Sequence, residues 1–438
     1  MADLERSWGV TPVPDRLRTL GFLDLALLWG NFGVSLLVLV AGALLVPALS
    51  LPTALGAIVV GGVLGNALLG LAGMIGAERR VPAMVLLREP LGQRGSYVPT
   101  VLNVAQNLGW ATFELIVIAT AANALAERVF GFEARWAWVL AFGALTLALA
   151  LSGPISFVRR WVRRFAVWVV VVSLAYLVWW VLTRADLGAL WSRPGKGGLT
   201  FWQGVDLTVA MAASWLPLAA DYTRFARGRR AAFWGTAIGY LAPNVALYAL
   251  GALVFLARDL SDPAALLPAL AAGGAASALA LLALTVDETD EPFANVYSAS
   301  VSIQNVFPAA PQPLLIVATT AVAVGGALAI DLVQYASFLY LLGSAFVPLF
   351  GVLAADYLLG AAPRASVRWS GLVAWAAGFC LYQWIQPTGP AAWTSFVAGH
   401  GSAGALAIGA SLPSFALAFA VYAALAPLVA PRPATARR

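Results

Sequence analysis

The stretch from residue 21 to residue 47 reads GFLDLALLWGNFGVSLLVLVAGALLVP, and one acid, Asp24, interrupts its apolar character. A membrane-spanning helix needs about 20 mostly apolar residues, so this stretch is long enough to cross a bilayer. Its middle carries Gly30 and Gly33, and glycine weakens a helix. The stretch therefore predicts a membrane span broken near its midpoint, although glycines in such helices also serve close packing alone.

The composition of the whole chain agrees with this prediction. The chain has 438 residues, 61% hydrophobic and 11% charged, with a mean hydropathy of +0.85. Soluble domains are about 45–50% apolar and roughly one-quarter charged, so polar residues are too few here to cover a soluble core. This excludes a soluble enzyme, a nucleic-acid-binding protein and a disordered scaffold. It predicts an all-α integral membrane protein.

Apolar runs of spanning length recur along the sequence and predict about twelve transmembrane helices. They are residues 21–47, 51–77, 97–125, 135–152, 165–183, 201–222, 233–256, 274–303, 312–329, 331–357, 369–386 and 409–430. We expect a cytoplasmic N-terminal segment at 1–20, one transmembrane domain at 21–430 and a cytoplasmic tail at 431–438. The polar residues 1–20 do not have the pattern of a cleavable signal peptide.

The basic residues predict the orientation. With the N-terminus inside, most of the 26 lysines and arginines fall in cytoplasmic loops, as the positive-inside rule requires. Both termini are then cytoplasmic, and the protein lies in the cell (cytoplasmic) membrane. The net charge of +6 follows from this bias and does not indicate a nucleic-acid partner.

The eighth run contains an acidic cluster, Asp287-Glu288-Thr289-Asp290-Glu291. One interpretation is an acidic loop that follows a short buried piece at 274–286. That interpretation changes the parity of the spans and places Arg364, Arg368 and the basic C-terminus outside. We therefore favour one long helix with the acids at its middle.

Two predicted breaks have matching positions. The first lies at Gly30-Asn31-Phe32-Gly33 and the second at Ser214-Trp215-Leu216-Pro217, five spans later. Many secondary transporters contain inverted repeats whose helices are broken near the membrane midplane. The spacing therefore favours two repeats of five helices each.

Acids inside the membrane are the main candidates for function. No Lys or Arg falls at the middle of a span, whereas Glu114 and the cluster at 287–291 lie deep. Such acids cost several kcal/mol unless they are protonated, hydrated or matched by a cation, which suits transport of cations or of substrates with amino groups. A neutral, hydrogen-bonded structural acid is the alternative for Glu114. The other intramembrane acids are expected to be interfacial charges or helix caps: Asp24, Asp206, Asp221, Asp331 and Asp356.

The third run places an aromatic plate beside a carboxylate. Trp110 and Glu114 are four residues apart, so they share one face of a helix. This pair can stack a flat heterocycle and accept hydrogen bonds from its N–H edge. Trp215, beside the second break, is a candidate for the opposite plate. Tryptophan also serves as a membrane-interface anchor, which is the alternative for both.

These residues belong to motifs that resemble one family. The motifs are WGVTPVP from residue 8, LLWGNFG from 27, QNLGWATFE from 106, SWLPLAADYTRF from 214 and ANVYSAS from 294. The chain resembles the nucleobase–cation symporters of the cytosine permease, hydantoin and allantoin transporter group. Within it, the chain is most similar to the branch predicted to carry hydroxymethylpyrimidine, a thiamin precursor.

The resemblance implies a LeuT-like fold, with inverted repeats at about 21–183 and 201–357 followed by two extra helices at about 369–430. It implies substrate stacking between Trp110 and Trp215, with a polar contact from Glu114. The other implied substrate-binding residues are Asn295, Gln106 and Ser214.

The resemblance also implies a sodium site between the broken first span and the eighth. Its ligands would be carbonyls near Gly30 and Gly33 and groups near Val286, Thr289 and Asp290. Relatives usually carry a Ser/Thr-Thr-Asn run where this chain has Thr289-Asp290-Glu291. A carboxylate there would either hold Na⁺ more strongly or carry a proton in its place, so H⁺ is the alternative coupling ion.

The function expected from these features is cation-coupled import by a monomer, working by alternating access. The Glu114 carboxylate favours aminopyrimidines such as hydroxymethylpyrimidine or cytosine over uracil and hydantoin, which lack the amine. Tyr335 and Phe338 are candidate gate residues, with core packing as the alternative for each.

Other functions fit the sequence less well. Another purine, pyrimidine, hydantoin or amino-acid-like substrate on the same fold is the main alternative. An amino-acid transporter would need a backbone site for a carboxylate at the first break. A channel would need pore-lining polar helices in a symmetric assembly. With one histidine, His400, and one cysteine, Cys380, the chain supplies neither an enzyme's catalytic set nor a histidine-based metal site.

Overall fold

The computed structural model describes residues 9–153, 167–330, 335–360, 365–401 and 408–429. Asp331, Arg364, the first eight residues and the tail 431–438 lie outside these ranges, as does the side chain of Asp290. Within the described part all regular secondary structure is helical, which confirms the predicted all-α class.

The first apolar stretch forms two helices, as predicted. Helix α2 (Phe22–Phe32) and helix α3 (Leu36–Leu45) meet at an angle of 61°. Helix α2 continues through Gly30, so the break begins later than the first glycine. Ser35 accounts for the restart of the helix, because its hydroxyl oxygen accepts a hydrogen bond from the backbone N–H of Leu37.

The sixth span is also interrupted where the sequence predicts. Helix α12 (Phe201–Ser214) ends one residue before helix α13 (Leu216–Thr223), and Trp215 lies between them. Pro217 occupies the first turn of α13, where the missing N–H of proline costs no helical hydrogen bond.

The prediction of one continuous eighth helix was wrong. Helix α16 (Ala275–Asp287) stops inside the acidic cluster and helix α17 (Asp290–Val306) begins after the turn Glu288–Thr289. The physical reason is that the carboxylate of Glu288 accepts hydrogen bonds from the start of α3, and this contact holds Glu288 in a turn between α16 and α17.

Further helices coincide with the remaining apolar runs and their connections. They are η1 (Asp15–Leu17), α4 (Leu51–Arg79), α5 (Ala83–Leu86), α6 (Arg88–Leu91), α7 (Tyr97–Phe130), α8 (Arg135–Ser152), α10 (Val167–Arg184), α11 (Leu187–Ser192), α14 (Arg229–Ala257), η3 (Pro263–Ala265), α15 (Leu266–Ala271), α18 (Gln312–Ala329), α19 (Tyr335–Leu359), α20 (Trp369–Ile385), α21 (Ala391–Gly399) and α22 (Ser411–Val429). In the described part six helices are long and apolar enough to span a membrane alone, and the bent pair α2–α3 makes a seventh. The count of twelve spans stays a prediction.

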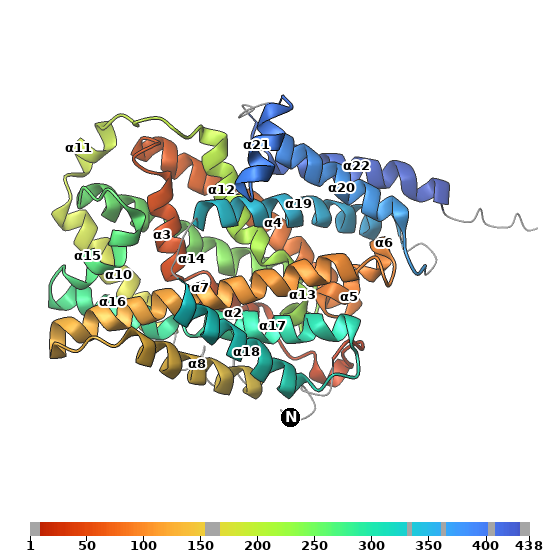
Figure 1. Cartoon of the computed structure of the whole chain (residues 1–438), viewed down its shortest axis with the longest axis horizontal. Helices are drawn as coiled ribbons and strands as arrows, with labels where there is room; N and C mark the ends of the chain where they lie inside the picture. The colour runs from red at the N-terminus through yellow and green to blue at the C-terminus, as the bar shows by residue number, and fades with distance from the viewer. Residues whose placement is uncertain (1–8, 154–166, 331–334, 361–364, 402–407, 430–438) are drawn as a thin grey trace, which may run out of the picture.

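The helices pack in distinct groups. Helix α14 lies against α2, α3 and α4, and α12 packs on α4. Helix α7 lies along α17, with α8 and α18 beyond them at the lower edge of Figure 1. Helices α20 and α22 pack on each other and on α19, at the opposite edge of the molecule. The first group thus contains the broken pairs α2–α3 and α12–α13, and the second contains α17.

Glycines allow α3 and α14 to approach closely. A Cβ atom on Gly42 would collide with the backbone of Tyr248, and one on Gly251 would collide with the backbone of Leu39. Such close backbone contact stabilises helix pairs in a bilayer, where lipid removes the hydrophobic drive for association.

We therefore expect Gly251→Ala to lower the thermal unfolding midpoint of the purified protein in detergent, because overpacking costs about 1–3 kcal/mol. Gly325→Ala is the matched control, since a Cβ at Gly325 in α18 would meet nothing within 4 Å. Equal midpoints for the two variants would contradict the close-packing argument.

Candidate functional site

A cavity lies where the broken helices meet. Its centre has about 10 Å³ of free space, about the room that one water molecule needs. The lining comes from α3, α7, α12, α14 and α17 together with the breaks beside α3 and α12. These residues are Ser35, Leu37, Val38, Trp110, Glu114, Met211, Ser214, Trp215, Tyr240, Glu291 and Asn295. Side chains must therefore move before a heterocycle can enter.

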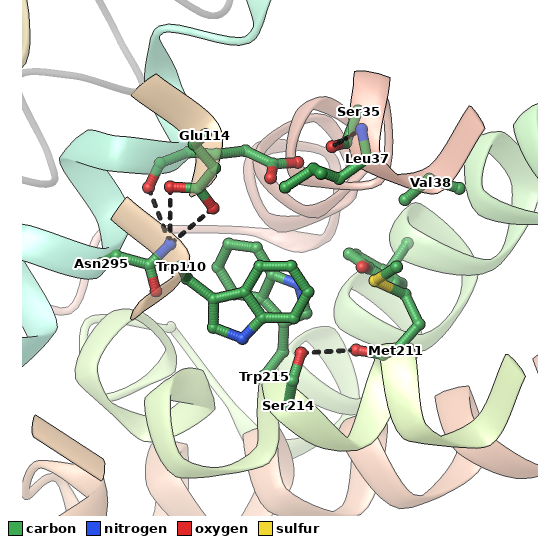
Figure 2. Close-up of a pocket in the computed structure, with 11 residues that line it drawn as sticks. Ser35, Leu37, Val38, Trp110, Glu114, Met211, Ser214, Trp215 and Asn295 are labelled. Carbon is green, nitrogen blue, oxygen red and sulfur yellow. Dashed lines mark hydrogen bonds between the residues drawn. The ribbon is translucent and has the colours of Figure 1, made fainter. Parts of the chain in front are cut away.

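The two predicted tryptophans both line this cavity (Figure 2). The ring of Phe32 stacks on Trp215, with centroids 5.0 Å apart and an interplanar angle of 14°. Trp29 meets Trp215 edge-on at 5.8 Å. Trp29 and Phe32 support the second plate, and sequence reasoning missed both, although they stand in the WGNF segment of the first break.

The proposed gate residues pack against the first plate. Tyr335 and Phe338 each contact the indole of Trp110 edge-on, with centroids 6.0 and 5.1 Å away. The hydroxyl of Tyr335 also donates to the carbonyl oxygen of Leu37, at 3.2 Å. Helix α19 thus covers one side of the cavity through these two rings, and their role as gates stays a prediction.

Glu114 and Asn295 come together although they are 181 residues apart in sequence. The Asn295 side-chain amide donates to both carboxylate oxygens of Glu114, at 2.8 and 3.1 Å, and to the backbone carbonyl of Glu291, at 3.2 Å. Glu114 is 1% exposed. Among the described residues, no Lys, Arg or His lines the cavity, so its ionisable lining consists of acids and one tyrosine.

Gln106 and Ser214 have different places. Ser214 lines the cavity, and its hydroxyl donates to the backbone carbonyl of Met211. Gln106 is not part of the lining, in contrast to its expected substrate contact. Its amide donates to Asn103, at 2.7 Å, and to the carbonyl oxygen of Ser214, at 3.0 Å. Gln106 therefore joins α7 to the end of α12 and positions the break.

Glu288 connects the first and eighth breaks. One carboxylate oxygen accepts from the hydroxyl of Ser35, at 2.9 Å, and the other accepts from the backbone N–H of Leu36, at 2.6 Å. Glu288 is 1% exposed. The acidic cluster was visible in the sequence, but it covers more than one helical turn, so periodicity could not identify this acid.

The residues of the implied sodium site lie at these two breaks. The hydroxyl of Thr289 donates to the carbonyl oxygen of Val286, at 2.8 Å, while the Val286 side chain is 41% exposed. Gly30 and Gly33 pack against the backbone of α14. The side chain of Asp290 lies outside the described part of the chain. Carbonyl and hydroxyl oxygens are suitable ligands for Na⁺, and the site stays a prediction.

Several acids near span ends act as helix caps, as expected. Asp24 accepts from the backbone N–H of Gly21, at 3.0 Å. Asp206 accepts from the N–H groups of Ala410 and Ser411 at the start of α22, and Asp221 accepts from that of Ala83 at the start of α5. Asp206 and Asp221 thus cap other helices than their own.

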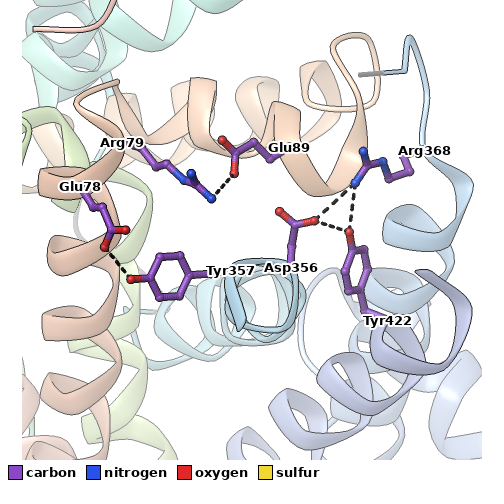
Figure 3. Close-up of polar contacts among 7 residues, drawn as sticks. All are labelled: Glu78, Arg79, Glu89, Asp356, Tyr357, Arg368 and Tyr422. Carbon is purple, nitrogen blue, oxygen red and sulfur yellow. Dashed lines mark hydrogen bonds and ion pairs between the residues drawn. The ribbon is translucent and has the colours of Figure 1, made fainter. Parts of the chain in front are cut away.

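Asp356 takes part in one of several polar contacts near the end of α19 (Figure 3). It accepts from Tyr422, at 2.5 Å, and pairs with Arg368, at 3.4 Å. Nearby, Arg79 pairs with Glu89 in α6, at 3.2 Å. Burial raises the pKa of Glu89, and the positive charge of Arg79 offsets part of that shift. The Asp356 contacts connect α19 with α22, and the Arg79–Glu89 pair connects α4 with α6.

Comparison with known proteins agrees with the family resemblance. Residues 12–368 match the model of a family described as permeases for cytosine/purines, uracil, thiamine and allantoin. The hydantoin permease of Microbacterium maritypicum is 24% identical over 376 residues, which cover 80% of this chain and 75% of that protein. The cytosine permease of Escherichia coli K12 is 24% identical over 336 residues, which cover 74% of this chain and 77% of that protein.

Solved structures confirm the predicted LeuT-like fold. Mhp1, a nucleobase-cation-symport-1 family transporter in a closed conformation with bromovinylhydantoin bound, superimposes with a TM-score of 0.78 at 20% identity. The match covers 95% of this chain and 94% of Mhp1. A Na⁺-coupled sialic acid symporter matches with a TM-score of 0.60 at 13% identity, over 94% of this chain and 97% of that one.

The cavity among broken helices, this fold and the family match agree with one another. The chain belongs to the family of permeases for cytosine, purines, uracil, thiamine and allantoin, and it is a membrane transporter and not an enzyme.

Proposed function

We propose that this protein is a secondary active, cation-coupled importer of a flat nitrogen heterocycle that carries an exocyclic amine. The substrates that we propose first are hydroxymethylpyrimidine and cytosine. The observation that carries the proposal is the buried carboxylate of Glu114, which lines the same cavity as Trp110 and Trp215.

The Glu114 carboxylate favours substrates that present a hydrogen-bond donor to it. An ionised carboxylate accepts hydrogen bonds and donates none. In the structure the Asn295 amide donates to both oxygens of Glu114. Cytosine has an amine where uracil has a carbonyl oxygen, so uracil would place an acceptor against the carboxylate. A site that hydrogen-bonds its substrate can reject an analogue without the donor by a factor of up to about 10⁴–10⁵.

The two indoles can contribute binding energy for any flat heterocycle that stacks on them. Stacking of a base on an aromatic side chain contributes about 1–3 kcal/mol. The cavity is too small for a heterocyclic substrate in this conformation. Tyr335 and Phe338 of α19 pack against Trp110 and cover one side of it. We infer that α19 and the broken helices move when substrate enters, as alternating access requires.

Na⁺ is the proposed coupling ion, with H⁺ as the alternative. Broken helices in transporters of this architecture supply backbone and side-chain oxygens for cations near the midplane. Here Glu288 of the eighth break hydrogen-bonds the start of α3 at the first break, and the adjacent Thr289 carries a hydroxyl that bonds the carbonyl oxygen of Val286. We further infer from the arginine distribution that the protein lies in the cytoplasmic membrane with both termini inside. We propose that it acts as a monomer.

Replacement of Glu114 tests the substrate class. We expect wild-type protein in proteoliposomes to take up cytosine or hydroxymethylpyrimidine in preference to uracil. Glu114→Gln should reduce this preference by about tenfold or more, because a hydrogen bond to a buried charged group contributes about 1.5–3 kcal/mol. Glu127→Gln, an exposed acid on the same helix, is the control. Unchanged selectivity in Glu114→Gln would refute the assignment.

The coupling ion can be measured in the same vesicles. An inward Na⁺ gradient should drive accumulation of substrate, and Thr289→Ala should raise the Na⁺ concentration needed for half-maximal uptake. Thr285→Ala is the control, because its buried hydroxyl donates to the carbonyl oxygen of Leu281 within α16. Uptake that follows an imposed pH gradient and ignores Na⁺ would assign the coupling to H⁺.

A further inference from the structure

The start of helix α3 borders the proposed substrate cavity. Ser35, Leu37 and Val38, which stand at this helix end, are among the lining residues. The first N–H groups of a helix lack intrahelical partners and carry partial positive charge, so they attract anions. In transporters with broken helices, such half-helix ends bind anionic groups of the substrate.

In this protein an internal carboxylate already takes that position. Glu288 accepts from the N–H of Leu36 and from the hydroxyl of Ser35, at 2.6 and 2.9 Å. The next N–H, that of Leu37, is bonded by the Ser35 oxygen. Hydrogen bonds with an ionised acceptor are roughly twice as strong as neutral ones, so a substrate carboxylate would have to displace a buried, well-bound group.

The remaining polar groups of the cavity suit a ligand without negative charge. Two acids, Glu114 and Glu291, line it, and no basic side chain does so within the described residues. The indole N–H of Trp110 is buried and has no hydrogen-bond partner among the described residues, which leaves a neutral donor for a ligand acceptor.

We propose that Glu288 is a specificity-determining residue: it supplies from within the chain the anion that the start of α3 attracts, and it thereby restricts transport to substrates without a carboxylate. The inference rests on the proposed import of flat heterocycles and refines the substrate class of that same site. Because Ser35 both lines the cavity and bonds Glu288, removal of the Glu288 carboxylate would open the Ser35 hydroxyl and the Leu36 N–H to a ligand.

The test compares cytosine with cytosine-5-carboxylate, which differ only by the anionic group. Affinities are measured by calorimetry on the full-length protein in detergent, for wild type, Glu288→Ser, Glu288→Gln and Glu114→Gln. The ratio of the two dissociation constants is the readout. Wild type should bind the carboxylate at least about 100-fold more weakly than cytosine, since like charges and an occupied helix end both oppose it.

In Glu288→Ser this ratio should fall by about tenfold or more, since the helix end becomes available to the ligand. Glu288→Gln keeps an acceptor for Leu36 but removes the charge, so its ratio should lie between those of wild type and Glu288→Ser. Glu114→Gln removes a cavity charge that is carried by α7, and it should change the ratio less than Glu288→Ser does. An equal or larger change in Glu114→Gln would overturn the assignment to Glu288.

Failure of this inference differs from failure of the proposed function. If cytosine binds all proteins and the ratio is the same in Glu288→Ser and wild type, Glu288 does not determine specificity. If Glu288→Ser does not fold, an unchanged ratio in Glu288→Gln leads to the same conclusion. If wild type binds none of cytosine, hydroxymethylpyrimidine and the carboxylate, the proposed function itself is wrong.

Discussion

A backbone polar group inside a bilayer must find its hydrogen-bond partner within the protein, because lipid offers none. This constraint makes a broken helix costly, and the breaks in the first and sixth spans are each stabilised by a side chain from elsewhere in the fold. Glu288 bonds the first N–H of α3, and Gln106 bonds the carbonyl oxygen of Ser214. These distant side chains let the backbone depart from regular helix where the broken helices meet around the cavity.

The same constraint explains how the chain keeps many acids in the membrane with few bases beside them. Asp206, Asp221 and Glu288 each accept from backbone N–H groups at the start of another helix. A helix N-terminus offers both donors and partial positive charge, so it stabilises a carboxylate as a basic side chain would. Asp356, which pairs with Arg368, is stabilised by a base instead.

Local signals in the sequence predicted much of the fold. Gly33 marked the first break, and Pro217 beside Trp215 marked the second, because both residues act on the backbone around them. The eighth helix was predicted incorrectly, because its interruption depends on a contact between Glu288 and Ser35 across 253 residues. The hydrophobic periodicity of a sequence does not indicate a contact between residues so far apart.

In the candidate site, too, local features could be predicted from the sequence and contacts between distant residues could not. Trp110 and Glu114 could be placed together from their helical spacing. Asn295 entered through the family resemblance, and its bond to Glu114 became evident only in three dimensions. The supporting ring of Phe32 and the positioning role of Gln106 depend on packing between separate helices, which the one-dimensional pattern does not contain.

The cap that Asp206 provides also bears on the architecture of the C-terminal end. This acid lies in the first half of α12, and its hydrogen bonds from Ala410 and Ser411 come from the beginning of the last helix. A chain that ended before Ala410 would leave a buried carboxylate in the sixth span with neither donor. The last helix therefore supplies the hydrogen-bond donors for a buried acid of the sixth span, and a shortened homologue would need a neutral residue at the position of Asp206.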